Sequence, residues 1–317
     1  MGHIISAMSS DSAQPSSSNR EVREEKRPVF VIGDSDVNKE EPHVDTSADV
    51  VMDLEDLEDL EDLGGDNDIE YEEEQQEEKK ILIPPVMGMS DGQMASVQNL
   101  FDLVTQQIEH GSNINVPKDA CVIVVDLETT GLIVHGKKAP RITELAAVSL
   151  SNPSEFITYL VKLPDDVKIG PKAKEISGID EKMCAEFGKT EIEVLLAFVV
   201  FVQEQLEKHK ATKAYLVAHN AFSFDAVLLA NAFTRTAFQT TLDCTKVFWT
   251  DSLVAARQSR QNAKNSLDIL MKTGFPGFDS ASMHRALADC MALCALIHSN
   301  RANMFDSLFF EKNTMKF

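Results

Sequence analysis

The chain has 317 residues, with 30 Lys plus Arg against 51 Asp plus Glu, so its formal net charge at pH 7 is −21. A surface with this mean charge repels polyanions, which excludes binding of nucleic acid through overall charge alone. The charge is unevenly distributed, because residues 1–90 hold 7 basic and 25 acidic residues while residues 91–317 hold 23 and 26. The first segment lacks the apolar density that offsets chain entropy, so we expect a disordered acidic tail over residues 1–90.

Cysteine content and hydropathy limit where the protein is expected to work. The five cysteines form no C-x-x-C pair, which argues against a disulfide framework or a zinc ribbon and favours a reducing compartment. No stretch approaches 18 apolar residues, and the first 30 residues contain no apolar core typical of a secretory signal. We therefore expect an intracellular protein of the nucleus or cytoplasm, without a transmembrane segment.

Three short patterns lie within the acidic tail. The first six residues fit the acceptor pattern for N-myristoylation at Gly2, although no second membrane signal accompanies it. Val29–Ile32 is an apolar tetrad flanked by acids that resembles a SUMO-interacting motif, or it is an isolated apolar patch. The repeat DLEDLEDLEDL over residues 53–63 is either a solvated acidic linker or a segment that binds a protein partner.

From residue 91 the chain has the composition of a folded protein. Apolar residues recur at helical spacing and predict an amphipathic helix over 92–110, namely Met94, Val97, Leu100, Phe101, Val104 and Ile108. We expect residues 91–118 to form this helix and a linker that pack on the following domain. That domain is expected to span residues 119–299, and residues 300–317 are expected to form a C-terminal tail.

Within 119–299, strands and helices alternate. The run CVIVVD at 121–126 is nearly all apolar, as in a buried central strand. Further strands are predicted at 142–150, 155–162 and 215–218, and helices at 171–176, 190–208, from 223, 250–258, 265–273 and 285–298. This order predicts an α/β fold in which helices flank a mixed sheet.

Two carboxylates follow the predicted central strand. Side chains alternate along a strand, so Asp126 and Glu128 project from the same face. Two such charges ~4 Å apart repel by about 4 kcal/mol at an effective dielectric constant of about 20. The pair therefore calls for a cation between its members.

Two further aspartates begin predicted helices. Asp225 ends the stretch HNAFSFD after a strand, and Asp289 lies in HRALADC, which opens an apolar helix. Taken singly, each is typical of a helix N-terminus. Together with Asp126 and Glu128 they place four carboxylates at the carboxyl edge of one sheet, and oxygen ligands of this kind suit Mg²⁺ or Mn²⁺.

The stretches VVDLETTGL, LVAHNAFSFD and HRALADC resemble the three motifs of the DnaQ-like family of Asp-Glu-Asp-Asp 3′→5′ exonucleases. This family includes the bacterial proofreading epsilon subunit and the three-prime repair exonucleases. The resemblance covers about residues 119–299 and implies a ribonuclease H-like fold. It also implies that two divalent ions act together on a phosphodiester at the 3′ end of a nucleic acid.

The resemblance assigns a role to each matching residue. Asp126, Glu128, Asp225 and Asp289 would hold the two metal ions. His284 would be the general base that takes a proton from the attacking water. The alternative for His284 is a polar residue before a helix with no chemical role, and in either case its spacing from Asp289 predicts a position on a loop.

Substrate contacts are implied by the same resemblance. Thr129 would meet the terminal 3′-OH through its backbone, and Leu132 would wedge against the last base or belong to the core. His219 and Asn220 would position Asp225 or line the path of the strand. A basic loop would neutralise substrate phosphates or be merely solvated, and it contains Lys137, Lys138 and Arg141.

These observations favour a metal-dependent 3′→5′ exonuclease of the proofreading or repair type. It would release nucleoside 5′-monophosphates from single-stranded or mispaired 3′ ends of DNA. The alternatives are an exoribonuclease of RNA processing and a non-catalytic adaptor that acts through the acidic tail.

Overall fold

The computed structural model describes residues 81–317 except 113, 239–241, 261–263, 280–282, 301–303, 306–308 and 312–313. The chain divides into two units, residues 1–74 and 75–317, and the fold concerns the second. The predictions for Gly2, Val29–Ile32 and the acidic repeat fall outside the described residues and stay predictions.

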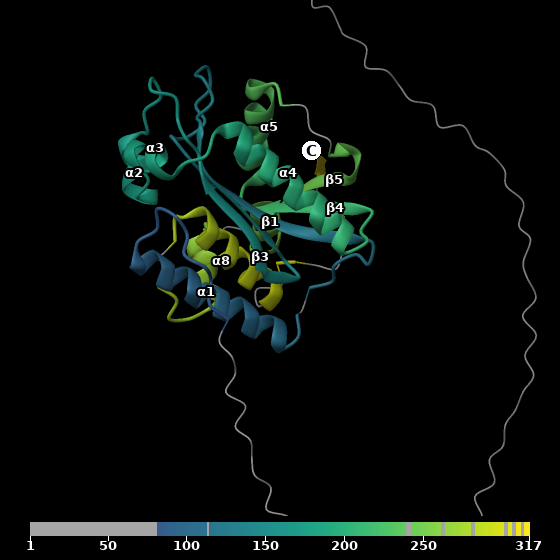
Figure 1. The fold of residues 1–317 in the computed structure, drawn as a ribbon. Coiled ribbons are helices and arrows are strands. Elements are labelled where there is room, and N and C mark those ends of the chain that lie inside the picture. Colours follow the sequence, from purple (N-terminus) through teal and green to yellow (C-terminus); the bar gives the residue numbers. More distant parts are fainter. Residues whose placement is uncertain are drawn as a thin grey trace, which may run out of the picture. The chain divides into compact units, whose positions relative to one another are not determined.

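The described residues contain a six-stranded mixed sheet in the order β3-β2-β1-β4-β5-β6 (Figure 1). β1 pairs antiparallel with β2 and parallel with β4, and β4 pairs parallel with β5. The strands are β1 (Ala120–Thr129), β2 (Ile142–Ser149), β3 (Asn152–Leu160), β4 (Lys213–Ala218), β5 (Val247–Asp251) and β6 (Thr314–Lys316). The α-helices are α1 (Asp91–Glu109), α2 (Pro171–Ser177), α3 (Glu181–Phe187), α4 (Glu191–Lys208), α5 (Asp225–Thr236), α6 (Ser252–Ser259), α7 (Leu267–Gly274) and α8 (Ala286–Ser299).

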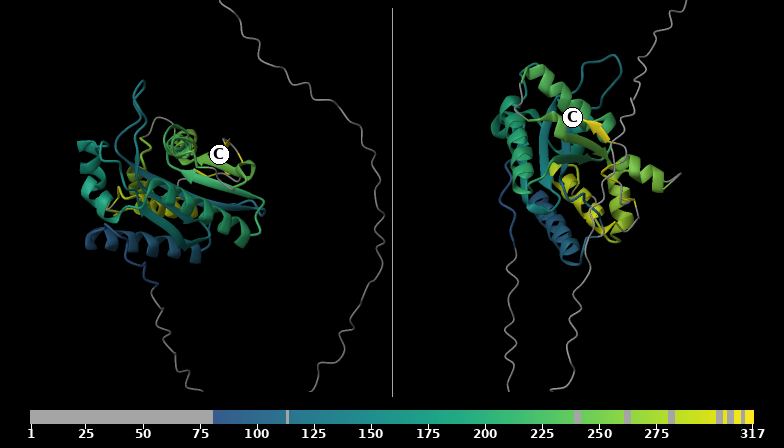
Figure 2. Two further views of the ribbon diagram at one scale, coloured as in Figure 1. Left: turned by 45° about the horizontal axis from the view of Figure 1, so that its top comes forward. Right: turned by 90° about the vertical axis from the view of Figure 1, so that its right-hand side faces the viewer.

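Helices cover both faces of the sheet, with α4 and α5 on one side and α8 and α1 on the other (Figures 1 and 2). The alternation of β1 side chains explains this layering. Val122 and Val124 belong to the cluster that contains α8, whereas Ile123 and Val125 belong to the cluster that contains α4. A strand buried on both faces needs the continuous apolar run found in the sequence.

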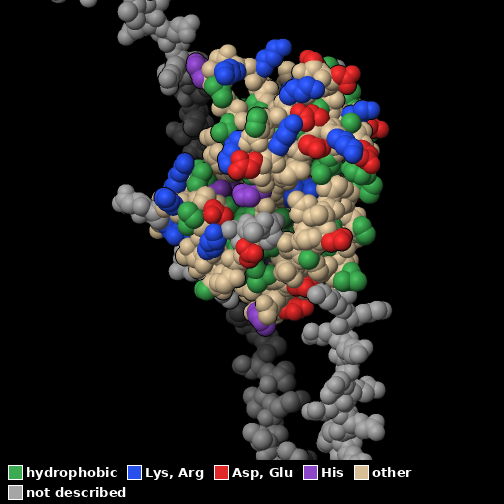
Figure 3. Space-filling model, turned by 90° about the vertical axis from the view of Figure 1, so that its left-hand side faces the viewer, with side chains coloured by type: hydrophobic (Ala, Val, Ile, Leu, Met, Phe, Trp, Pro, Cys, Tyr) green, Lys and Arg blue, Asp and Glu red, His purple; other side chains and the backbone are tan. Residues whose placement is uncertain are grey.

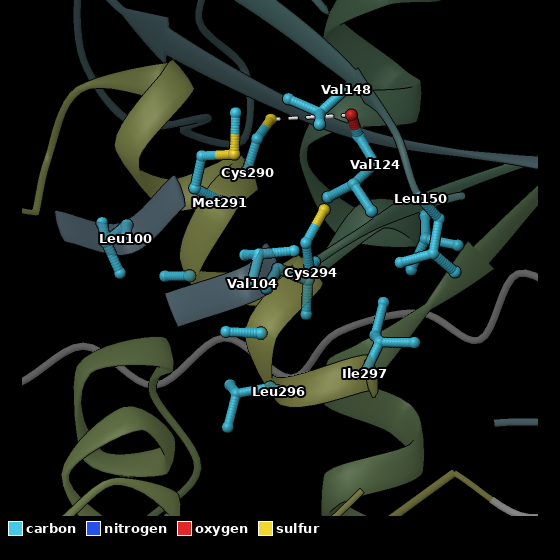
Figure 4. Close-up of a cluster of buried hydrophobic side chains, with 14 of the residues drawn as sticks. Leu100, Val104, Val124, Val148, Leu150, Cys290, Met291, Cys294, Leu296 and Ile297 are labelled. Carbon is cyan, nitrogen blue, oxygen red and sulfur yellow. Dashed lines mark hydrogen bonds between the residues drawn. The ribbon is translucent and has the colours of Figure 1, made fainter. Parts of the chain in front are cut away.

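Helix α8 is the most deeply buried helix of this core. Apart from Asp289, every one of its side chains is buried, because β1 and β2 cover one side and α1 covers the other. Figure 4 shows the contact, in which Leu100 and Val104 of α1 lie near Cys290 and Cys294 of α8. The Cys290 thiol donates a hydrogen bond to the Val124 carbonyl oxygen at 3.6 Å. The α8 helix is thus fixed against the central strand.

The strand order and the helices on both faces form a ribonuclease H-like fold, so the predicted α/β fold class is confirmed. The helix expected at 92–110 is present as α1. None of the helices in the described part of the chain is both long and apolar enough to cross a membrane.

Both ends of the described chain contribute to the domain. Residues 81–90 were expected in the acidic tail, yet Ile83 is buried and Ser90 caps α1. The segment 300–317 was expected to lie outside the domain, yet β6 pairs with β5 and three buried phenylalanines join the core, namely Phe305, Phe309 and Phe310. Their aromatic side chains bury large apolar areas, which explains why these short segments pack.

The structure differs from the sequence prediction around residue 250. A helix was expected over 250–258, but α6 begins only at Ser252 because Asp251 caps it by accepting from the Leu253 N–H. The preceding residues form strand β5, and α3 was also not predicted. Trp249 and Thr250 favour strands, but a five-residue strand next to a helix shows too little periodicity to be recognised.

Candidate active site

Three of the four predicted metal ligands meet at the end of the central strand. Asp126 and Glu128 continue the side of β1 that begins with Val122 and Val124, so they point toward α8. There they meet Asp289, in the first turn of α8, and one carboxylate oxygen from each lies within 4.8 Å of the others. Elements far apart in sequence thus converge on one acidic group.

The fourth predicted ligand, Asp225, approaches from the other layer. It is the first residue of α5 and is only 2% exposed. Its carboxylate accepts a hydrogen bond from the backbone N–H of Leu127, which lies between Asp126 and Glu128. Asp225 also raises the pKa of Asp126 by direct repulsion, so the four acids share one electrostatic site.

All four carboxyls have raised pKa values. Burial is the largest cause in each case, and repulsion from neighbouring acids adds to it. The pKa of Asp225 rises to about 8 and that of Asp289 to about 7. Acids with such pKa values must hold protons or neutralise a cation to coexist near neutral pH.

The donor set fits hard divalent cations. The group offers carboxylate oxygens, which are the ligands that Mg²⁺ and Mn²⁺ prefer. Repulsion from neighbouring acids contributes to the raised pKa values of Asp126 and Glu128, and bound cations would compensate this negative charge. The residues present therefore fit the cations that the sequence predicts.

His284 lies beside this group on the segment that leads into α8. The expected loop position is confirmed, because the helix begins two residues later at Ala286. Its side chain is exposed, and its backbone N–H lies 3.4 Å from Asp289 Oδ1. Its φ of 79° is left-handed, which is uncommon for a residue other than glycine.

His219 has both of its ring nitrogens in contact with other groups of the protein. Its Nδ1 lies 2.9 Å from Ser252 Oγ, and its Nε2 lies 2.8 Å from the carbonyl oxygen of Asn265. Both ring nitrogens are therefore engaged within the protein, and burial lowers the pKa of the ring. Both expectations for His219, that it positions Asp225 or that it lines the path of the strand, stay predictions.

Asp251 is a part of the site that the sequence analysis missed. Its Oδ1 accepts from the backbone N–H of Asn220 at 3.0 Å, and its Oδ2 accepts from that of Phe222 at 3.1 Å. Asn220 has a φ of 76°, so this buried carboxylate holds a left-handed turn just before Asp225. The signal in the sequence that could have identified Asp251 was an acidic residue at the end of an apolar strand.

Glu144 and Arg285 were also missed. Glu144 lies opposite Glu128 in the β1–β2 register and points to the same side of the sheet, where Arg285 pairs with it. Both side chains are only 1% exposed. An acid within the apolar strand ITELAAVS was the signal for Glu144, but only the structure reveals its partner 141 residues away.

The last residue of β1 and the loop after this strand carry the other predicted substrate contacts. Thr129 is buried, with its hydroxyl donating to the Gly131 carbonyl at 2.7 Å. Leu132 is 80% exposed, which rules out a core position and leaves it free to meet a ligand. Arg141 of the basic loop pairs with Glu191 at 3.0 Å, so part of its charge is already compensated within the protein.

Charges of both signs are interspersed on one face of the described chain, with histidines toward its middle (Figure 3). No single sign of charge dominates this face among the coloured residues. A polyanion on this face would therefore meet local groups of both signs rather than a uniform basic surface.

Comparison of the sequence with known families decides the class. The model of the RNase T exonuclease family, described as Exonuclease, matches residues 123–297. The chain belongs to this exonuclease family. The match contains all five predicted catalytic positions, and it leaves α1 and β6 outside.

Two curated relatives are 28% identical to this chain. Ribonuclease T of Photorhabdus laumondii aligns over 37% of the chain and 55% of its own length, and exonuclease DPD1 of Arabidopsis thaliana over 66% and 64%. The chain thus spans more than half but less than two thirds of the length of each of these relatives. Among solved structures, a zinc-bound complex of E. coli exonuclease I with single-stranded DNA is similar at 20% identity and a TM-score of 0.48, over 60% of this chain and 43% of that one.

Proposed function

We propose that the protein is a 3′→5′ exonuclease that removes nucleoside 5′-monophosphates from single-stranded or mispaired 3′ ends of DNA. The observation that carries this proposal is the convergence of Asp126, Glu128 and Asp289 within 4.8 Å, with Asp225 beside them and His284 at the rim. A proofreading or repair role would follow from this specificity for 3′ ends.

Four residues of this site would hold two divalent cations, Mg²⁺ or Mn²⁺, namely Asp126, Glu128, Asp225 and Asp289. When bound, such ions stabilise negative charge on the attacking and leaving oxygens of a phosphodiester. In the absence of cations, burial is the largest cause of the raised pKa values of these four carboxyls, and repulsion within the group adds to it for Asp126, Glu128 and Asp225. Cation binding and catalysis would thus draw on one set of side chains.

His284 would accept the proton of the attacking water on a neutral ring nitrogen. Its exposed side chain at the rim of the acidic group can reach a water beside a bound phosphodiester. The exposed Leu132 would press against the terminal base, and the backbone around Thr129 would meet the 3′-OH. These contacts would select a chain end over an internal position.

The test compares matched DNA oligonucleotides labelled at the 5′ or the 3′ end, single-stranded or with a mispaired 3′ end, in Mg²⁺ or Mn²⁺. We expect stepwise shortening from the 3′ end and nucleoside 5′-monophosphates as products, identified by mass spectrometry. Asp126→Ala should abolish the reaction, whereas the exposed Asp165→Asn should retain it. Wild-type protein that shortens none of these substrates, like the Asp126→Ala variant, would refute the proposal.

The His284→Ala variant tests the role of the general base independently of metal binding. We expect it to lower kcat by about 10²- to 10⁴-fold, the range typical of a general base, while calorimetry with Mn²⁺ shows unchanged binding. A fully active His284→Ala variant would show that another group takes the proton.

RNA is the second candidate substrate, and the similarity to a protein named ribonuclease T favours it. The same site chemistry can hydrolyse either nucleic acid. Ribo- and deoxyribo-oligonucleotides of one sequence, compared by kcat/KM under identical conditions, distinguish the two. A higher value for RNA would make the protein an exoribonuclease while leaving the proposed site intact.

A further inference from the structure

An arginine lies buried directly after His284. The Nε of Arg285 donates to Glu144 Oε2 at 2.9 Å, and its Nη2 donates to Oε1 at 2.7 Å, so both carboxylate oxygens are engaged. Both side chains are 1% exposed. This planar, two-point geometry fixes the orientation of the guanidinium as well as its position.

The same pair binds backbone groups on several elements. Arg285 Nη1 donates to the Gly88 carbonyl at 2.9 Å and lies 3.3 Å from Gln93 Oε1. Glu144 Oε2 also accepts from the backbone N–H of Ala286 at 3.0 Å. The pair therefore joins β2, the start of α1 and the start of α8 at one point.

The backbone at His284 needs such support. A left-handed φ is unfavourable for a residue with a Cβ atom, and it persists where its surroundings impose it. Of the described non-glycine residues with positive φ, three follow helix ends, whereas two precede the segments that carry Asp225 and Asp289. These two are Asn220, held by Asp251, and His284.

Helix α8 and His284 are anchored differently. Nearly every α8 side chain is buried, so its core contacts fix Asp289 without help from the ion pair. The His284 side chain is exposed, and its direction depends on the backbone conformation that Arg285 and Ala286 hold. Loosening the pair should therefore disturb the histidine more than the aspartate.

We propose that Glu144 and Arg285 are positioning residues that act through His284, holding its left-handed backbone so that the imidazole faces the reacting water. This inference rests on the proposed function, in which His284 is the general base. Neither residue is placed in contact with substrate. Two residues outside the family match take part, namely Gly88 before α1 through its carbonyl and Gln93 in the first turn of α1 through its side chain.

Arg285→Lys and Glu144→Gln test the proposal. Lysine keeps the charge but lacks the two-point geometry. We expect single-turnover rate constants on a 3′-labelled DNA oligonucleotide to fall by about 10- to 100-fold, as expected for a misplaced catalytic group. In Arg285→Lys, which preserves the charge next to the acidic group, KM should stay within about twofold and Mn²⁺ binding measured by calorimetry should be unchanged.

Arg235→Lys is the matched control. Arg235 also engages both oxygens of one glutamate, Glu191, but it lies in the last turn of α5, ten residues beyond Asp225. A lysine there should leave the rate constant unchanged. An equal loss in Arg285→Lys and Arg235→Lys would show a general effect of breaking ion pairs and would overturn the proposal.

A double-mutant cycle tests whether Arg285 acts through His284. In a His284→Ala background, Arg285→Lys should lower the residual rate constant no further, because the group that it positions is gone. The proposal is overturned if Arg285→Lys has the wild-type rate constant, or if it causes the same fold-loss with and without His284.

If the single variants do not fold, a double variant with apolar residues at both positions provides the test. Replacing a buried ion pair by apolar side chains of similar size commonly retains folding. The double variant Glu144→Leu, Arg285→Met should keep the wild-type melting temperature and Mn²⁺ affinity but lose about tenfold or more in rate constant, and full activity would overturn the positioning role. Inactive wild-type protein would instead contradict the proposed function, so the two failures are distinguishable.

Discussion

Asp225 and Asp289 belong to the group of four acids at the end of β1, and burial is the largest cause of their raised pKa values. Burial raises their pKa values to about 8 and about 7, whereas an unfolded aspartate titrates near 4. At a pH between the unfolded and the folded pKa values, these carboxyls keep their protons in the folded protein and have lost them in the unfolded chain. These two carboxyls should therefore stabilise the metal-free protein most below about pH 4. Their contribution to its free energy of unfolding should fall as the pH rises from about 4 to 8.

The slope is up to about 1.4 kcal/mol per pH unit for each carboxyl that stays protonated only in the folded protein. Urea unfolding in EDTA at a series of pH values measures it. Asp225→Asn should reduce the slope, the exposed Asp165→Asn should not, and Mn²⁺ should stabilise the wild type most at high pH, where it binds ionised carboxylates. A metal-free stability that rises across this range would contradict the assignment of these pKa values.

At the scale of elements, α1 stabilises the domain from outside the family match. It packs along α8, and its Leu100 is 2% exposed. Leu100→Ala should lower the free energy of unfolding by about 2–5 kcal/mol, because it leaves a cavity against the helix that carries Asp289. Thermal and urea unfolding check this value. The same substitution at Leu196, which is half exposed on α4, should change stability by less than about 0.5 kcal/mol.

The elements also show which features of the fold and the site can be predicted from the sequence and which cannot. The long periodic runs predict α1, α4 and β1 well, and the motifs predict that Asp126 and Asp289 meet. The ion pair of Glu144 with Arg285 could not be predicted, because 141 residues separate its members and no local pattern links them. The two engaged nitrogens of His219 likewise depend on Ser252 and Asn265, whose proximity only the tertiary fold creates.

At the scale of the whole molecule, the net charge of −21 conflicts with a polyanionic substrate only until its distribution is considered. Residues 1–78 carry 5 basic and 25 acidic residues, which leaves 25 and 26 in residues 79–317 and a net charge of −1 there. Four of those 26 acids are the proposed metal ligands. With two divalent ions bound, the charge of this part would become +3.

The acidic segment should therefore act on substrate association rather than on chemistry. A variant lacking residues 1–78 should have a lower KM for a DNA oligonucleotide at low ionic strength and an unchanged kcat, because tethered negative charge repels the substrate. The difference should shrink between about 0.01 and 0.3 M salt as the Debye length falls from about 30 Å to below 8 Å. Steady-state kinetics over this salt range measure it. A changed kcat, or a KM difference that does not depend on salt, would mean that the segment contacts the site directly instead of acting through its charge.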